Sequence, residues 1–314
     1  MVKLNKTLFI TGSSGFIGKN IAKSMRQNYT LLTPSHNELD LLSQSEVHQF
    51  FLKNDVDIVI NCANFGGTRK TRATGEVIEK NTRMFFNLAE NQDHFSKLIH
   101  LGSGAEYNKN RNLQKISETE FGKNIPRDEY GFSKYIISKY IEKTENMYCL
   151  RLFGIFGKYE DYEFKFISNA IVKNLLHLPI TVRQNVNFSW LYIDDFLEIL
   201  EYFLTHDPKY STYNLTPSSP TDLVSIAQLI NSLSDFKSEI CVENDGLNLE
   251  YSGDNTRLIE EVGDFPFTPM KSSIKNLIEY YSSILPAIDP EIIRKDSLAA
   301  YCKINPETKR GHDR

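Results

Sequence analysis

Short apolar runs alternate with amphipathic stretches through the first half of the chain. A run as apolar as Asp57-Ile58-Val59-Ile60-Asn61-Cys62 predicts a strand buried on both faces. The stretches between such runs place apolar residues on one helical face, as at Ile17, Ile21 and Met25. The predicted strands cover 7–10, 29–32, 39–42, 57–62, 97–102 and 147–152, and the predicted helices cover 16–27, 43–53, 76–90 and 128–144. Ser43-Gln44-Ser45-Glu46 predicts a capping box at the start of the second helix.

Strands separated by helices of this length predict an α/β fold with a Rossmann-type, doubly wound parallel sheet. The pattern changes after about Phe156, where a helix over 164–176, strands over 179–182 and 190–193, a helix over 196–205 capped by Asp194, and a strand over 213–215 are expected. We therefore predict a first domain over 1–158, to which segments near 188–215 return. A smaller α/β domain over 159–302 and a polar tail over 303–314 follow.

A glycine-rich turn, Thr11-Gly12-Ser13-Ser14-Gly15-Phe16-Ile17-Gly18, joins the first predicted strand to the first predicted helix. Glycines at this place let the backbone approach a pyrophosphate, which sits at the helix N-terminus against unpaired N–H groups. The alternative is a tight strand–helix turn without a ligand. The strand before the turn and the helix after it favour a dinucleotide site.

The end of the second predicted strand bears on which dinucleotide binds. An NAD site usually has an acidic residue there to hold the ribose 2′-hydroxyl. The chain has Thr33-Pro34-Ser35-His36-Asn37 instead, without a carboxylate. Since these side chains would not repel a 2′-phosphate, the sequence favours NADP(H) and leaves NAD(H) possible.

A tyrosine and a lysine four residues apart, Tyr130 and Lys134, lie on one face of the predicted helix over 128–144. A nearby ammonium favours the phenolate and would lower the pKa of the tyrosine toward neutrality. Ser103, after the fifth predicted strand, would hydrogen-bond the substrate oxygen and this tyrosine. The overlapping pair Tyr135 and Lys139 fits the same spacing. Tyr130 is favoured because it lies near the helix start and Gly131 leaves room for a ligand.

With the glycine turn, Ser103, Tyr130 and Lys134 in this order, the chain resembles the extended short-chain dehydrogenase/reductase family, in its nucleotide-sugar epimerase, dehydratase and reductase group. The resemblance implies a nucleoside-diphosphate sugar as substrate and a homodimer formed through a helix bundle. It implies catalytic roles for Ser103, Tyr130 and Lys134 and substrate contacts at Gly104, Ala105 and Arg183. The implied cofactor-binding residues are Gly12, Ser14, Gly15, Phe16, Ile17, Ser35, Asp40, Leu41, Cys62, Ala63, Asn81, Tyr130 and Lys134.

Departures from the group's pattern narrow the expected chemistry. Where dehydratases carry an Asp-Glu pair, this chain has Gly104 and Ala105, with Glu106 one position late. Where epimerase-reductases carry a Cys and a His, it has Ala105 and Tyr159. We therefore expect an NAD(P)-dependent reductase of a 4-keto-6-deoxy sugar. The alternatives are a C4 epimerase with tightly bound NAD and a dinucleotide sensor without turnover.

Composition and charge exclude several other classes. The 314 residues are 40% hydrophobic, carry a net charge of −4 and lack any apolar run long enough for a membrane span. Four separated cysteines and seven scattered histidines suggest free thiols, a cytoplasmic location and no metal site. We expect neither nucleic acid nor a membrane as a partner. Arg69-Lys70-Thr71-Arg72 is either a phosphate clamp or a solvated loop.

Overall fold

A six-stranded parallel sheet forms the centre of the molecule. The computed structural model describes residues 6–66 and 75–305; the Arg69–Arg72 stretch lies outside them. The sheet has the strand order β11-β6-β4-β3-β1-β2. All its neighbouring strands are parallel. Its strands are β1 (Thr7–Thr11), β2 (Thr30–Leu32), β3 (Ile58–Asn61), β4 (Lys97–Ser103), β6 (Met147–Leu152) and β11 (Thr212–Leu215). The Rossmann-type prediction is thus confirmed.

Helices cover both faces of this sheet. One apolar cluster packs the sheet against α2 (Gln44–Lys53), α3 (Val77–Ala89) and α4 (Glu129–Ile141). A second cluster packs the opposite face against α1 (Phe16–Met25) and α6 (Ile193–Thr205). The strands β3, β4 and β6 are buried along their whole length, as their continuous apolar sequences require.

The order of the strands reverses between β1 and β3. From β1 the chain adds β2 on one side and then crosses to β3 on the other. In such sheets ligands bind beyond the carboxyl ends of the strands at this point of reversal. Strand β11 pairs with β6, with Thr212 opposite Cys149, so a segment distant in sequence completes the sheet.

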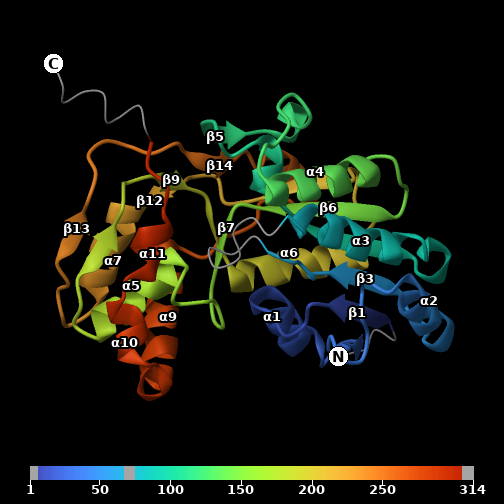
Figure 1. Ribbon diagram of the computed structural model, residues 1–314, viewed down its shortest axis with the longest axis horizontal. Helices are drawn as coiled ribbons and strands as arrows, with labels where there is room; N and C mark the ends of the chain where they lie inside the picture. Colours follow the sequence, from blue (N-terminus) through green and yellow to red (C-terminus); the bar gives the residue numbers. More distant parts are fainter. Residues whose placement is uncertain (1–5, 67–74, 306–314) are drawn as a thin grey trace.

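The remaining elements lie outside the central sheet and the helices named above, and Figure 1 shows α5, α7 and α9 at one end of the molecule, far from α2. The helices are α5 (Phe166–Leu175), α7 (Leu223–Leu233), α8 (Thr256–Val262), α9 (Met270–Ile284), α10 (Pro290–Arg294) and α11 (Ser297–Tyr301). Small sheets pair β7 (Gly154–Phe156) with β10 (Trp190–Tyr192), and β8 (Ile180–Val182) with β13 (Ile240–Val242). A four-stranded sheet has the order β12-β9-β14-β5, from Thr221–Asp222, Asn187–Phe188, Tyr251–Gly253 and Leu113–Ile116. Short 3₁₀ helices are η1 (Gln92–His94), η2 (Gly104–Tyr107), η3 (Glu118–Glu120) and η4 (Leu285–Ala287).

Three local predictions were wrong. Residues 39–42 form no strand, and 41–42 lie in a turn, because the Asp40 carboxylate accepts a hydrogen bond from the Leu42 amide. Asp194 does not cap α6, since that helix begins at Ile193. The expected capping box at the start of α2 is half formed. Ser43 accepts from the Glu46 amide, but the Glu46 carboxylate accepts from the Asp40 amide instead.

Candidate active site

The glycine turn follows β1 directly and has the close packing that a phosphate cradle requires. Gly12 has a φ of +63°, and a Cβ there would lie 2.9 Å from the Ala63 amide nitrogen. The Gly15 amide donates to the Gly12 carbonyl at 3.1 Å, and Gly15 directly precedes α1. A side chain at Gly12 would therefore both strain the backbone and fill the space beside β3. These residues fit a bound pyrophosphate.

A cavity of about 400 Å³ opens beside this turn, at the carboxyl ends of β1, β2 and β3. Lys80 and Met84 of α3 also line it and were missed by the sequence reasoning. Cys62, just after β3, is half-buried, and burial raises the pKa of its thiol to about 12. Six of the predicted cofactor-binding residues line the cavity: Gly12, Ser14, Ser35, Asp40, Leu41 and Ala63.

A carboxylate lies beside Ser35, in the segment that follows β2. Glu38 accepts hydrogen bonds from both the amide and the hydroxyl of Ser35, each at 2.7 Å. These bonds lower the pKa of Glu38. The expectation that no carboxylate stands near Ser35 was wrong, because Glu38 folds back onto it. Within the same cavity, Lys80 is paired with Glu76 at 3.0 Å.

Ser103 and Tyr130 meet where β4 ends and α4 begins. Asp128 caps α4 by accepting from the Gly131 amide at 3.0 Å, which places Tyr130 in the first turn. Burial raises the pKa of the Tyr130 phenol to about 12, and a hydrogen bond with Ser103 opposes that rise. Gly131 serves packing rather than a ligand, since a Cβ there would lie 2.8 Å from the Ala105 carbonyl oxygen.

Lys134 lies one turn further along α4, and its ammonium contacts the sheet. Its Nζ donates to the Leu101 carbonyl at 2.7 Å and lies 3.4 Å from Nε2 of His100. Burial lowers the pKa of Lys134, and the nearby Glu106 carboxylate opposes this. In this arrangement burial raises the Tyr130 pKa, where a lowering was expected, and the hydrogen bond with Ser103 opposes the rise.

A chain of buried polar groups connects Lys134 to the glycine turn. His100 Nδ1 lies 3.1 Å from the side-chain nitrogen Nδ2 of Asn61, and the Thr11 hydroxyl donates to the side-chain oxygen Oδ1 of Asn61 at 2.8 Å. The pKa of His100 is well below its usual value because the ring is buried and near Lys134. The sequence signal for these residues was available: Thr11 and Asn61 are the polar last residues of β1 and β3, and His100 is a polar residue between Ile99 and Leu101 of β4.

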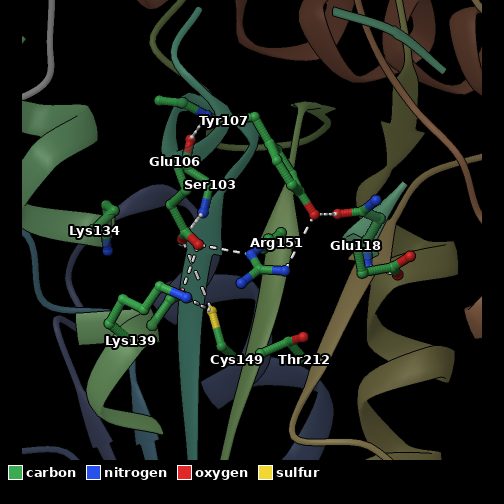
Figure 2. Close-up of polar contacts among 12 residues, drawn as sticks. Ser103, Glu106, Tyr107, Glu118, Lys134, Lys139, Cys149, Arg151 and Thr212 are labelled. Carbon is green, nitrogen blue, oxygen red and sulfur yellow. Dashed lines mark hydrogen bonds and ion pairs between the residues drawn. The ribbon is translucent and has the colours of Figure 1, made fainter. Parts of the chain in front are cut away.

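Glu106 forms a second buried network behind Ser103 (Figure 2). Its carboxylate accepts from the Ser103 amide at 2.8 Å, from the Ser138 hydroxyl at 2.6 Å and from Arg151 Nε at 2.7 Å. Glu106 and Arg151 are both fully buried. Arg151 also donates to the Tyr107 hydroxyl, at 3.1 Å. Glu106 thus joins the end of β4 to α4 and β6.

Ser103 and Glu106 form a capping box on η2, with the Ser103 hydroxyl accepting from the backbone of the helix. The S-x-x-E pattern of Ser103-Gly104-Ala105-Glu106 signals this arrangement in the sequence, and the sequence reasoning missed it.

The side chains of two other predicted site residues, Asn81 and Arg183, bind other groups within the protein. The Asn81 amide binds the backbone of Phe65, accepting from its nitrogen at 2.7 Å and donating to its carbonyl at 3.0 Å. It therefore holds the segment after β3. Arg183, just after β8, pairs with Glu243 at 2.6 Å. Its predicted contact with the substrate diphosphate stays a prediction.

Within residues 6–66 and 75–305, no cluster of His, Cys, Asp and Glu side chains has the arrangement of a metal site. No helix in these same ranges is both long and apolar enough to cross a membrane.

The sheet, the glycine turn and the Ser103–Tyr130–Lys134 group together define a protein of the nicotinamide-dinucleotide-dependent, Rossmann-fold class. The model of the NAD dependent epimerase/dehydratase family matches residues 8–216, and the chain belongs to this family. The family resemblance inferred from the motifs is thereby confirmed.

Individual relatives are distant. The chain is 22% identical over 226 residues to the GDP-L-colitose synthase of Yersinia pseudotuberculosis, covering 64% of this chain and 73% of the relative. The solved structure of UDP-glucose 4-epimerase from Thermotoga maritima is similar with a TM-score of 0.76 at 18% identity, covering 89% of this chain and 99% of that one. A GDP-mannoheptose C4 reductase from Campylobacter jejuni with NADP bound gives 0.77 at 17% identity, covering 88% and 98%.

Proposed function

We propose that the protein is an NAD(P)-dependent reductase of a nucleoside-diphosphate 4-keto-6-deoxy sugar. The observation that carries this proposal is the packing of α4, which holds Tyr130 and Lys134, against the residues that follow Ser103 at the carboxyl end of β4: a Cβ at Gly131 would lie 2.8 Å from the Ala105 carbonyl oxygen. The cavity beside the glycine turn supports a bound dinucleotide, and it opens at the same carboxyl edge of the sheet as the end of β4. When bound, the dinucleotide supplies the hydride that reduces the C4 carbonyl.

Each side chain then has a distinct part. Tyr130 gives its proton to the forming C4 alkoxide, and Ser103 donates a hydrogen bond to the same oxygen. Lys134 lies on the sheet side of Tyr130, where we propose that it binds the nicotinamide ribose and favours the Tyr130 phenolate that forms. Burial of Tyr130 keeps the phenol protonated until the substrate oxygen takes the proton.

The surroundings of Ser103 favour reduction over dehydration. Elimination of water needs an acid and a base beside the sugar, and Gly104 and Ala105 supply neither. Glu106 is the nearest carboxylate in sequence, but it is fully buried and paired with Arg151 at 2.7 Å. The name of the similar GDP-mannoheptose C4 reductase also agrees with reduction at a sugar nucleotide.

We propose NADPH as the preferred reductant, with Lys80 as the cation near a 2′-phosphate. Glu38 opposes this preference, because its carboxylate lies on Ser35. Replacing Glu38 with Gln is therefore expected to tighten NADPH binding and leave NADH binding nearly unchanged. Titration of both nucleotides by fluorescence measures this. Equal changes for both nucleotides would argue against a 2′-phosphate near Ser35.

A C4 epimerase that keeps NAD bound is the second candidate, and the Glu38 carboxylate is the observation that favours it. The same Ser103 and Tyr130 would remove and return hydride through a 4-keto intermediate. Purified protein that releases stoichiometric NAD on denaturation, and that interconverts C4 epimers without added reductant, would establish this candidate instead.

The test of the reductase is loss of NADPH absorbance with 4-keto-6-deoxy sugars carried on GDP, CDP, dTDP and UDP. We expect turnover with one of these nucleotides, and a fall of about 10²- to 10⁴-fold in kcat for Tyr130→Phe. Tyr135→Phe is the matched control, since Tyr135 belongs to the rival Tyr135/Lys139 pair and packs on Phe121 with ring centres 5.1 Å apart. Absence of turnover with every sugar would contradict the proposal.

A further inference from the structure

A second phenol reaches the catalytic serine from the other side of the site. The hydroxyl of Tyr251, on β14, lies 3.4 Å from Oγ of Ser103. The two residues are 148 positions apart in the chain. Hydrogen bonds in ligand-free active sites are commonly this long and shorten when substrate binds.

The backbone of Tyr251 is fixed by its place in a sheet. It lies opposite Leu113 of β5 and opposite Phe188 of β9. The Ser189 amide donates to its carbonyl at 3.1 Å. Because strands on both sides hold β14, the direction of the Tyr251 side chain is set by the fold rather than by a mobile loop.

The ring of Tyr251 is packed as well as its backbone. Phe153 and Phe188 lie against it, with ring centres 5.2 and 5.4 Å away. Gly104 makes room for this arrangement, since a Cβ there would lie 2.8 Å from the Tyr251 hydroxyl and 2.6 Å from the Phe153 ring. The absence of a side chain beside Ser103 thus has a reason beyond contact with substrate.

The hydrogen bonds at Ser103 show what Tyr251 contributes. A serine hydroxyl has one hydrogen to donate and two lone pairs to accept. The Ala105 amide donates to Ser103 Oγ at 3.2 Å and uses one lone pair. If the Tyr251 hydroxyl donates to the other, the Ser103 hydrogen is left to point at Tyr130 or at the substrate oxygen.

We infer that Tyr251 is a positioning residue, which donates to Ser103 and so directs the Ser103 hydroxyl toward Tyr130 and the reacting oxygen. This inference rests on the proposed reductase for its effect on turnover, but the hydrogen bond itself does not. The inference gives the sheet that contains β14 a role in catalytic geometry, because Tyr251 on β14 orients the Ser103 hydroxyl at the end of β4.

The test is a double-mutant cycle of Tyr251→Phe and Ser103→Ala. Tyr251→Phe keeps the packed ring and removes one hydroxyl, so we expect kcat to fall about 3- to 10-fold with KM nearly unchanged. In the Ser103→Ala background the same substitution is expected to have no further effect, because its target is gone. Tyr135→Phe again serves as the control. Equal effects of Tyr251→Phe in both backgrounds would overturn the inference.

A measurement without turnover separates this inference from the proposed function. The tyrosinate absorbance of Tyr130 is titrated with oxidised dinucleotide present, as the difference between each protein and the same protein carrying Tyr130→Phe. We expect Tyr251→Phe to raise the pKa of Tyr130 by roughly half to one pH unit, since a less well directed Ser103 stabilises the phenolate less. An unchanged pKa would refute the inference even if reductase activity is found. A raised pKa would support it even if no 4-keto sugar is reduced.

Discussion

Two buried glutamates show opposite ways of keeping a carboxylate inside this protein. Glu106 is fully buried and has the Arg151 guanidinium at 2.7 Å. Glu160, just before α5, is 5% exposed and has the Ser168 hydroxyl at 2.5 Å. Burial raises the pKa of Glu160 to about 7, although Lys165 and Ser168 both oppose the rise. A hydroxyl and a more distant ammonium therefore do not balance the cost of burying this charge.

The charges of the two carboxylates therefore have opposite effects on the stability of the fold. Glu106 lies against Ser103 and needs its charge to balance Arg151, so its removal leaves a buried cation without a counter-ion. Glu160 lies near Tyr281 and Asp161, and no ion pair with Glu160 is found among the described residues. The negative charge of Glu160 therefore destabilises the fold. The first carboxylate supports the fold through its charge, and the second weakens the fold near neutral pH.

Glu106→Ala is expected to have the largest effect on the free energy of unfolding among the changes at the two sites. The Arg151 guanidinium would remain buried without its anion, and we expect a loss of about 3–5 kcal/mol in the free energy of unfolding. Urea unfolding followed by circular dichroism measures this. Glu106→Leu combined with Arg151→Met removes both charges and is expected to recover most of the loss. A cost below about 1 kcal/mol for the single variant would show that the pair does not balance charge as described.

Glu160→Gln should act in the opposite direction and only above acidic pH. The pKa of Glu160 is higher in the folded protein, at about 7, than its ordinary value of 4.5. The folded state therefore holds the proton more tightly, and its stability falls as pH rises from about 4.5 to 7. The variant is expected to gain about 3 kcal/mol over the wild type at pH 8 and almost nothing at pH 4.5. A gain that is equal at both pH values would contradict the assignment.

Ser168→Ala removes the hydroxyl that donates to Glu160 and so tests how much this hydrogen bond stabilises the buried carboxylate. Because hydrogen bonds to charged groups are the stronger ones, we expect a loss of about 2 kcal/mol at pH 8 and about 1 kcal/mol at pH 5. The measurement is urea unfolding at both pH values. In the Glu160→Gln background the dependence on pH should disappear; its persistence would mean that another group titrates.

Ser138→Ala is the matched change at Glu106 and should have the smallest effect. Glu106 keeps Arg151 and the Ser103 amide after the Ser138 hydroxyl is lost, so we expect a loss of about 1 kcal/mol. A loss larger than that of Ser168→Ala at pH 8 would reverse the ranking of the two sites.

The sequence was sufficient for those features that depend on local pattern and strand direction. Ser103 and Tyr130 could be placed together because the end of β4 and the start of α4 lie at the same edge of a parallel sheet. Residues 39–42 were misassigned because a short apolar run looks the same in a turn as in a strand, and the Asp40 side chain decided between them.

The remaining features depend on where long side chains point. Glu106 turns toward Arg151, 45 positions away in the chain, and this direction does not follow from spacing alone. Both contacts of a glutamate with a serine had a local signal, because Ser35-His36-Asn37-Glu38 and Ser103-Gly104-Ala105-Glu106 share the S-x-x-E pattern of a capping box. Tyr251 had none, since it reaches Ser103 from 148 residues away and its approach depends on the pairing of β14.

The pairing of β11 with β6 has a consequence for folding order. During synthesis β6 stays an open edge, with unpaired backbone groups, until residues near 212–215 have left the ribosome. Strand β11 also carries Asn214, whose side chain accepts from the Tyr107 hydroxyl at 2.7 Å. A nascent chain that stops at residue 158 therefore has five of the six strands of the central sheet but lacks β11, the strand that pairs with the β6 edge. Such a chain is expected to aggregate through that edge rather than fold as an autonomous domain.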